Sequence, residues 1–201
     1  MPSLGTRVLP WSGGELTLIR HDFSGMLGVE VIAEPELAQA LWEFLTAPER
    51  HTPAALAGSD ALNICRIESG IPWVPHEIND GVLPAETGQL ERAVSYQKGC
   101  YLGQEVVERM RSRGGLARKL CGLVLTGDTI PECGSAIADA DGAVVGSTAS
   151  ACPSPATRAV IALAYVKTAT AKPGTRVSVA VNGTRIAGTV SDLPFAVPAT
   201  A

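Results

Sequence analysis

The segment Tyr96-Gln97-Lys98-Gly99-Cys100-Tyr101-Leu102-Gly103-Gln104-Glu105 is the most unusual part of this 201-residue sequence. It predicts a turn that leads from a short strand, Val94–Tyr96, into an amphipathic helix over Gly103–Arg111. The two glycines of the turn allow backbone N–H groups to approach a ligand closely. The segment is therefore the first candidate for a functional site.

Cys100 is the candidate reactive group of this segment. It lies two residues from Lys98 and directly before the predicted helix, and both a cation and a helix N-terminus favour the thiolate form of cysteine. The alternative is an inert, buried cysteine in a tight strand-to-helix turn. The five cysteines are widely spaced and form no C-x-x-C pair, so we expect reduced thiols and no metal site.

The residues upstream predict an α+β layer. Short apolar runs at Glu15–Ile19 and Gly28–Ile32 are typical of strands, and the residues between them have turn composition. Helices are predicted from Pro35 onward, where apolar residues repeat at helical spacing, and from Ser59 to Gly70. Strands and helices mixed in this order favour one α+β module over residues 1–115.

The residues downstream change character near Gly114-Gly115. Polar and apolar residues then alternate with a period of two, and Asp141-Gly142 and Asn182-Gly183 are hairpin signals. This spacing of strands predicts a small antiparallel barrel or sandwich over residues 116–201. The predicted strands are Lys119–Leu125, Ala143–Ser147, Ala159–Val166, Arg176–Val181 and Arg185–Val190.

Composition excludes several classes of protein. The longest apolar runs fall short of the ~18 residues that a membrane helix needs. Residues 1–11 have no basic segment followed by an apolar one, so we expect no signal peptide and a cytoplasmic location. The chain is 46% hydrophobic and 18% charged, which is unlike a disordered protein. Its net charge of −4 argues against direct binding of nucleic acid.

The charge is unevenly distributed. Residues 92–119 contain seven basic and two acidic residues, a local excess of positive charge within an acidic chain. Such a basic patch suits an anionic ligand or partner, whereas the alternative is a solvated helix face followed by a loop. The candidate members of the patch are Arg109, Arg111, Arg113 and Arg118.

The residues from Lys98 to Glu105 match the signature of the folate-binding YgfZ family, which belongs to the same group as the glycine cleavage T-protein, an aminomethyltransferase. The resemblance rests on Lys98, Gly99, Cys100, Tyr101, Gly103, Gln104 and Glu105. The stretches Arg66–Pro72, Leu83–Glu86 and Ile161–Val166 also resemble the group. The resemblance implies a partial GcvT-like folate-binding module followed by a small antiparallel β-barrel.

The resemblance also implies a function. Members of the YgfZ family are expected to use tetrahydrofolate and to support iron–sulfur cluster assembly or repair in client enzymes, including enzymes that modify tRNA. Cys100 and Lys98 are then the reactive residues. The expected partners are folate and iron–sulfur client or assembly proteins, without direct contact to nucleic acid or membrane. The alternatives are an aminomethyltransferase of the glycine cleavage system and an inactive remnant.

Folate-binding residues follow from the same resemblance. The T-protein relatives bind the pterin through a turn and a following glutamate, which match Phe23 and Glu30 here. A carboxylate accepts two parallel N–H bonds from a 2-amino-pyrimidinone edge. The relatives carry an arginine near the position of Ser59, so we expect that contact to be lost or moved to Arg66 or the basic patch.

The resemblance places a longer N-terminal segment before residues 20–30, and in the T-proteins that segment carries an aspartate at the one-carbon centre. The present sequence contains no such segment. A natural short form, a misassigned start and a fragment are the three explanations that the sequence leaves open. We expect folate binding by this chain alone to depend on which of them holds.

Overall fold

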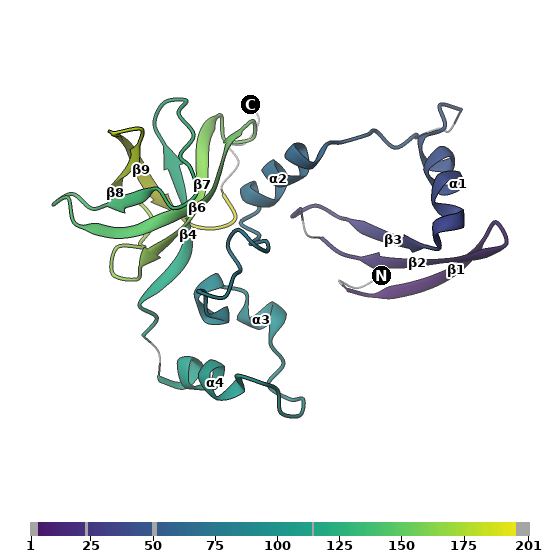
Figure 1. Cartoon of the computed structure of the whole chain (residues 1–201), viewed down its shortest axis with the longest axis horizontal. Coiled ribbons are helices and arrows are strands. Elements are labelled where there is room, and N and C mark those ends of the chain that lie inside the picture. Colours follow the sequence, from purple (N-terminus) through teal and green to yellow (C-terminus); the bar gives the residue numbers. More distant parts are fainter. Residues whose placement is uncertain (1–3, 23, 50–51, 114, 196–201) are drawn as a thin grey trace. The chain divides into compact units, whose positions relative to one another are not determined.

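The computed structural model describes residues 4–22, 24–49, 52–113 and 115–195, and it divides into two compact units, Met1–Arg66 and Ile67–Ala201. Figure 1 shows a three-stranded sheet with helices in the first unit and a β-barrel in the second. Residues 67–117 belong to the same compact unit as the barrel. The division into domains at residues 1–115 and 116–201 stays a prediction.

The first unit is built on an antiparallel sheet in the order β1-β2-β3. Its strands are β1 (Thr6–Trp11), β2 (Gly14–Arg20) and β3 (Val29–Ala33). Strands β2 and β3 lie where the apolar runs predict them. Strand β1 is not among the strands that the sequence predicts. It contains Pro10, which is tolerated because β1 is an edge strand.

Two helices follow the sheet. Helix α1 (Pro35–Thr46) begins with a proline, whose fixed φ suits the first turn of a helix. It packs on the sheet through Phe44, whose ring centroid lies 5.9 Å from that of Trp11. Helix α2 (Ser59–Glu68) ends before Gly70, whose φ of +68° is the left-handed conformation that closes many helices. Both helices therefore lie where the sequence predicts them.

The segment between α2 and the barrel differs from its prediction. It forms a short 3-10 helix η1 (Pro84–Thr87), a single turn α3 (Leu90–Ala93) and helix α4 (Gln104–Arg113). The strand predicted at Val94–Tyr96 is wrong: Val94 is the C-cap of α3, and Ser95 and Tyr96 are loop. A short segment with β-branched and aromatic residues has the composition of a strand. It forms a strand only where another strand lies close enough to pair with it.

The second unit contains the closed antiparallel barrel β4-β7-β6-β5-β8-β9. An α+β module followed by a small antiparallel barrel is therefore the observed fold class, as the sequence predicts. The turn at Asn182-Gly183 has φ of +48° and +78°, the pair of positive values that a two-residue hairpin needs. The barrel strands are β4 (Arg118–Leu125), β5 (Ala136–Ala138), β6 (Val144–Ser154), β7 (Ala159–Lys167), β8 (Arg176–Val181) and β9 (Thr184–Ser191).

Two strands of the barrel depart from their prediction. Strand β6 extends to Ser154, well beyond the predicted end at Ser147, and its register with β7 shifts between Thr148 and Ser150. This irregularity interrupts the alternation of polar and apolar residues, so the pattern hides the second half of β6. Strand β5 has three residues, too few to give a periodic signal.

Small aliphatic side chains fill the barrel. Leu123, Ile137, Val166 and Val179 are fully buried, and alanines and valines from the other strands complete the cluster. Because residues on a strand alternate between its two faces, the period-two pattern of the sequence supplies this core. None of the helices within the described ranges is long and apolar enough to cross a membrane.

A charged cluster ties η1 to the barrel. We call Glu86, Arg118 and Tyr165 the Glu86 cluster. The Arg118 guanidinium donates to both carboxylate oxygens of Glu86, at 3.0 and 3.1 Å, and lies over the Tyr165 ring at 5.1 Å. It also donates to the backbone oxygen of Gly81 at 2.7 Å. Since η1 packs against β4, α3 and α4, the cluster fixes the element on which α4 rests.

Candidate functional site

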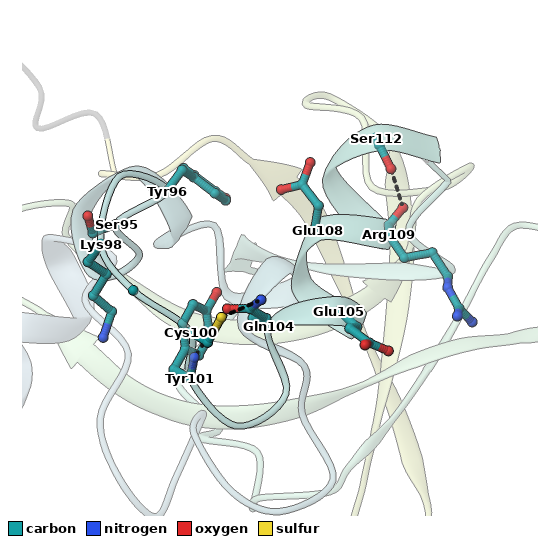
Figure 2. Close-up of a pocket in the computed structure, with 11 residues that line it drawn as sticks. Ser95, Tyr96, Lys98, Cys100, Tyr101, Gln104, Glu105, Glu108, Arg109 and Ser112 are labelled. Carbon is teal, nitrogen blue, oxygen red and sulfur yellow. Dashed lines mark hydrogen bonds between the residues drawn. The ribbon is translucent and has the colours of Figure 1, made fainter.

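A cavity of about 560 Å³ opens beside the start of α4, and Figure 2 shows the side chains around it. We call it the Cys100 cavity. Its walls come from the loop before α4 and from α4 itself, so one continuous stretch of sequence forms the site. The lining residues are Ser95, Tyr96, Lys98, Gly99, Cys100, Tyr101, Gln104, Glu105, Glu108, Arg109 and Ser112.

Gln104 holds the turn that carries Cys100. Its amide oxygen accepts the backbone N–H of Tyr101 at 3.1 Å, and its amide nitrogen lies 3.6 Å from the Cys100 sulfur. A glutamine that reaches back three residues to a backbone N–H is a common way to begin a helix. Gly103 has φ of +86°, a left-handed conformation that a residue with a Cβ adopts only at a cost. These two motif residues therefore have a structural reason for their identity.

Cys100 is exposed, so the alternative of a buried, inert cysteine does not describe it. Its sulfur points toward the Gln104 amide in Figure 2. Lys98 Nζ lies 5.0 Å from the centroid of the Tyr101 ring, a cation–π contact that holds the ammonium beside the turn. The structure thus gathers Lys98, Cys100, Tyr101 and Gln104 at one cavity, while their chemical roles stay predictions.

Native-state alkylation is expected to separate the exposed thiols from the buried ones. Cys100 and Cys133 are exposed, whereas Cys121 and Cys152 are buried, and burial raises the pKa of Cys121 to about 11. Iodoacetamide at about pH 8 should therefore modify Cys100 and Cys133 first, as measured by peptide mass spectrometry. Unfolded protein, in which all thiols react, is the control. Equal native rates at Cys100 and Cys121 would contradict this arrangement.

The basic patch is only partly a single surface. Arg109 lines the Cys100 cavity, together with the carboxylates of Glu105 and Glu108. The cavity therefore carries both signs of charge. Arg118 belongs to the Glu86 cluster, where its guanidinium is bound to a carboxylate. The side chains of Arg111 and Arg113 lie outside the described residues. Anion binding by the patch stays a prediction.

The predicted folate-binding residues lie in the first unit. Glu30 is exposed on β3, and its Oε1 lies 2.7 Å from Nδ1 of His21. Phe23 lies outside the described residues. Arg66 is fully buried in α2, where its Nε donates to Asn63 Oδ1 at 2.8 Å. Burial leaves Arg66 no exposed surface for a ligand in this conformation, whereas Glu30 is accessible.

Sequence reasoning missed His21, because nothing in composition marks it as the partner of Glu30. The available signal is the hairpin register. Arg20 pairs with Val29 and Ile19 pairs with Glu30, so His21 lies opposite Gly28 and diagonal to Glu30. Diagonal neighbours on one face of an antiparallel pair are within reach of long side chains.

The two parts of the chain match the two domains of one protein group. Residues 1–98 match the GCVT N-terminal domain, and residues 118–196 match the glycine cleavage T-protein C-terminal barrel domain. A crystal structure of the glycine cleavage system aminomethyltransferase T from Bartonella henselae has the same fold, with a TM-score of 0.77 at 24% identity. The structural match covers 90% of the present chain and 50% of the Bartonella henselae chain. The two domain matches and the shared fold support the GcvT-like family.

Curated relatives bear the name aminomethyltransferase. The protein from Chlorobium luteolum is 33% identical over 200 residues, which cover 96% of this chain and 53% of the relative. The protein from Streptomyces coelicolor is 34% identical over 190 residues, covering 92% of this chain and 50% of the relative. The chain thus spans about half the length of the curated relatives it matches. These relatives support the wider group that the sequence predicts, but they do not single out the YgfZ family.

Proposed function

We propose that the chain binds tetrahydrofolate and takes part in one-carbon transfer of the aminomethyltransferase kind, with Glu30 as the contact for the pterin edge. The match of both parts of the chain to the two T-protein domains carries this proposal. The names of the curated relatives favour aminomethyl transfer over the other activities expected from the sequence.

The chemistry of Glu30 fits a reduced folate. A 2-amino-pyrimidinone edge offers two parallel N–H groups, and an ionised carboxylate accepts both. Glu30 is exposed on its strand, and His21 holds one of its oxygens at 2.7 Å. A carboxylate oxygen has a second lone pair, so the contact with His21 leaves the carboxylate able to accept from a ligand. Glu30 would therefore hold the pterin, and the folate would supply the one-carbon acceptor.

Two measurements on the full chain test the proposal. Titration with tetrahydrofolate, followed by tryptophan fluorescence or calorimetry, should show a dissociation constant in the micromolar range. Transfer of a one-carbon unit from an aminomethylated lipoyl carrier to tetrahydrofolate should then be detectable by mass spectrometry. Folate binding without transfer would leave folate recognition standing and contradict the aminomethyltransferase reaction. Absence of folate binding would contradict both.

A second candidate function has its own observation. The exposed thiol of Cys100 lies in a cavity with Lys98, inside the segment that resembles the YgfZ signature. An exposed cysteine there favours the accessory role in iron–sulfur cluster assembly or repair, with client enzymes that include tRNA-modifying ones. This role uses the same folate site and adds the thiol.

Replacement of Cys100 tests the second candidate. The assay uses cells that lack their own copy of the accessory protein. In these cells we expect the Cys100→Ser variant to fail to restore the activity of an iron–sulfur enzyme, while its affinity for folate stays unchanged. Cys133→Ser, which removes another exposed thiol on the barrel unit, is the matched control. Full rescue by Cys100→Ser would count against a role for this thiol and would favour the aminomethyltransferase reaction.

A further inference from the structure

His21 and Glu30 meet at the loop end of the hairpin formed by β2 and β3. Nδ1 of His21 lies 2.7 Å from Oε1 of Glu30, a short hydrogen bond. The side chains are 32% and 45% exposed. The pair is therefore accessible to a ligand, and the Glu30 carboxylate is not buried behind the ring.

The backbone fixes the place of His21. Its N–H donates to the carbonyl of Gly28 at 3.1 Å, and the N–H of Gly28 donates to Asp22 Oδ1, also at 3.1 Å. A Cβ at Gly28 would collide with the carbonyl oxygen of His21, so only glycine permits this close approach. The loop is thus closed at its base, two residues before Glu30.

The other charges of the loop are already paired. Asp22 accepts from Arg20 at 3.3 Å, and the Gly28 N–H together with Arg20 lowers the pKa of Asp22 below its usual value. The Asp22 carboxylate is therefore held in place and forms an ion pair with the Arg20 guanidinium. Glu30 is the carboxylate that accepts from the His21 ring in this hairpin.

From this geometry we propose that His21 is a positioning residue for Glu30, a role that rests on the proposed binding of folate. The ring carries its proton on Nδ1 and donates it to Oε1. This bond restricts rotation of the carboxylate and presents the Glu30 oxygens to the paired N–H groups of the ligand. Preorganisation of an exposed carboxylate lowers the entropy lost when the ligand binds.

Replacement of His21 by asparagine tests whether a hydrogen-bond donor at position 21 orients the Glu30 carboxylate. Asn Nδ2 occupies nearly the position of His Nδ1 and donates in the same direction. His21→Asn should therefore keep the hydrogen bond to Glu30, whereas His21→Ala removes it. We expect the affinity for tetrahydrofolate to fall about tenfold in His21→Ala and to stay within about twofold of wild type in His21→Asn.

The ring tautomer provides a readout that does not depend on folate. In ¹⁵N NMR spectra of neutral His21, the wild-type chain should show the proton on Nδ1, and Glu30→Ala should shift it toward Nε2. An unchanged tautomer in Glu30→Ala would overturn the hydrogen bond on which the role depends. The predicted tautomer shift supports the bond and leaves the affinity measurements to decide its purpose.

The affinity measurements separate this inference from the proposed function. If His21→Ala and the wild-type chain bind tetrahydrofolate with equal affinity, the role of His21 is overturned and the folate site still stands. Equal losses in His21→Ala and His21→Asn would also overturn it, because orientation by a donor would not explain them. No binding by the wild-type chain would contradict the proposed function and, with it, the role assigned to His21.

Discussion

Replacement of Arg118 by Met should lower the free energy of unfolding by about 3 kcal/mol, because it leaves the carboxylate of Glu86 without its counter-ion. The Glu86 side chain is only 8% exposed, whereas that of Arg118 is 40% exposed. The loss falls mainly on the buried carboxylate, which retains the backbone N–H of Leu83 as a donor at 3.1 Å. Urea unfolding followed by circular dichroism measures the effect.

A double-mutant cycle isolates the interaction between the two side chains. Glu86→Gln removes the buried charge, so Arg118→Met should cost less in that background than in the wild type. Arg176→Met is the matched control, because it removes the same charge from an exposed position on β8 and should change stability by less than about 0.5 kcal/mol. Additive effects of Glu86→Gln and Arg118→Met would show that the two groups do not stabilise each other.

The same pair has a consequence for the Cys100 cavity. Helix η1 carries Glu86 and packs against α4, which forms one wall of the cavity. Arg118 is therefore linked to the wall of the Cys100 cavity through η1, and its role in the basic patch stays a prediction. A charge excess in a sequence cannot distinguish a cation held by a buried carboxylate from one that faces solvent.

The fold was predictable where a pattern repeats. Alternating residues predicted five barrel strands, and Pro35 and Gly70 marked a helix start and a helix end that the structure has. The pattern failed where the structure is irregular or short, as at β5 and in the second half of β6. It also failed at Val94–Tyr96, because strand pairing needs a partner strand that local sequence does not reveal.

The candidate site was predictable in part for the same reason. Lys98, Cys100 and Gln104 are close in sequence, so local geometry alone brings them to one cavity. The members of the pairs Arg118–Glu86 and His21–Glu30 are 32 and nine positions apart, so each pair depends on the path of the chain between its members. The matches to the two T-protein domains cover residues 1–98 and 118–196, whereas the YgfZ-like role depends on one short segment and stays a proposal.

Replacement of Glu30 by Gln is expected to weaken tetrahydrofolate binding about 100-fold, which is close to 2.7 kcal/mol. Glutamine retains one acceptor oxygen at this exposed position on β3 but replaces the other by an NH₂ donor. That donor would face an N–H of the pyrimidinone edge, so one attractive contact becomes a repulsive one. Fluorescence titration of the purified variant measures the change.

Glu15→Gln is the matched control for this change, because Glu15 is also exposed in the same sheet and carries the same charge. It should bind folate as the wild type does, so that a loss confined to Glu30→Gln reports a local contact and not a change in net charge. Both variants should unfold at nearly the wild-type temperature, since neither carboxylate is buried. Equal affinities of Glu30→Gln and Glu15→Gln would remove Glu30 from the folate site, and the pterin contact would then have to come from other residues.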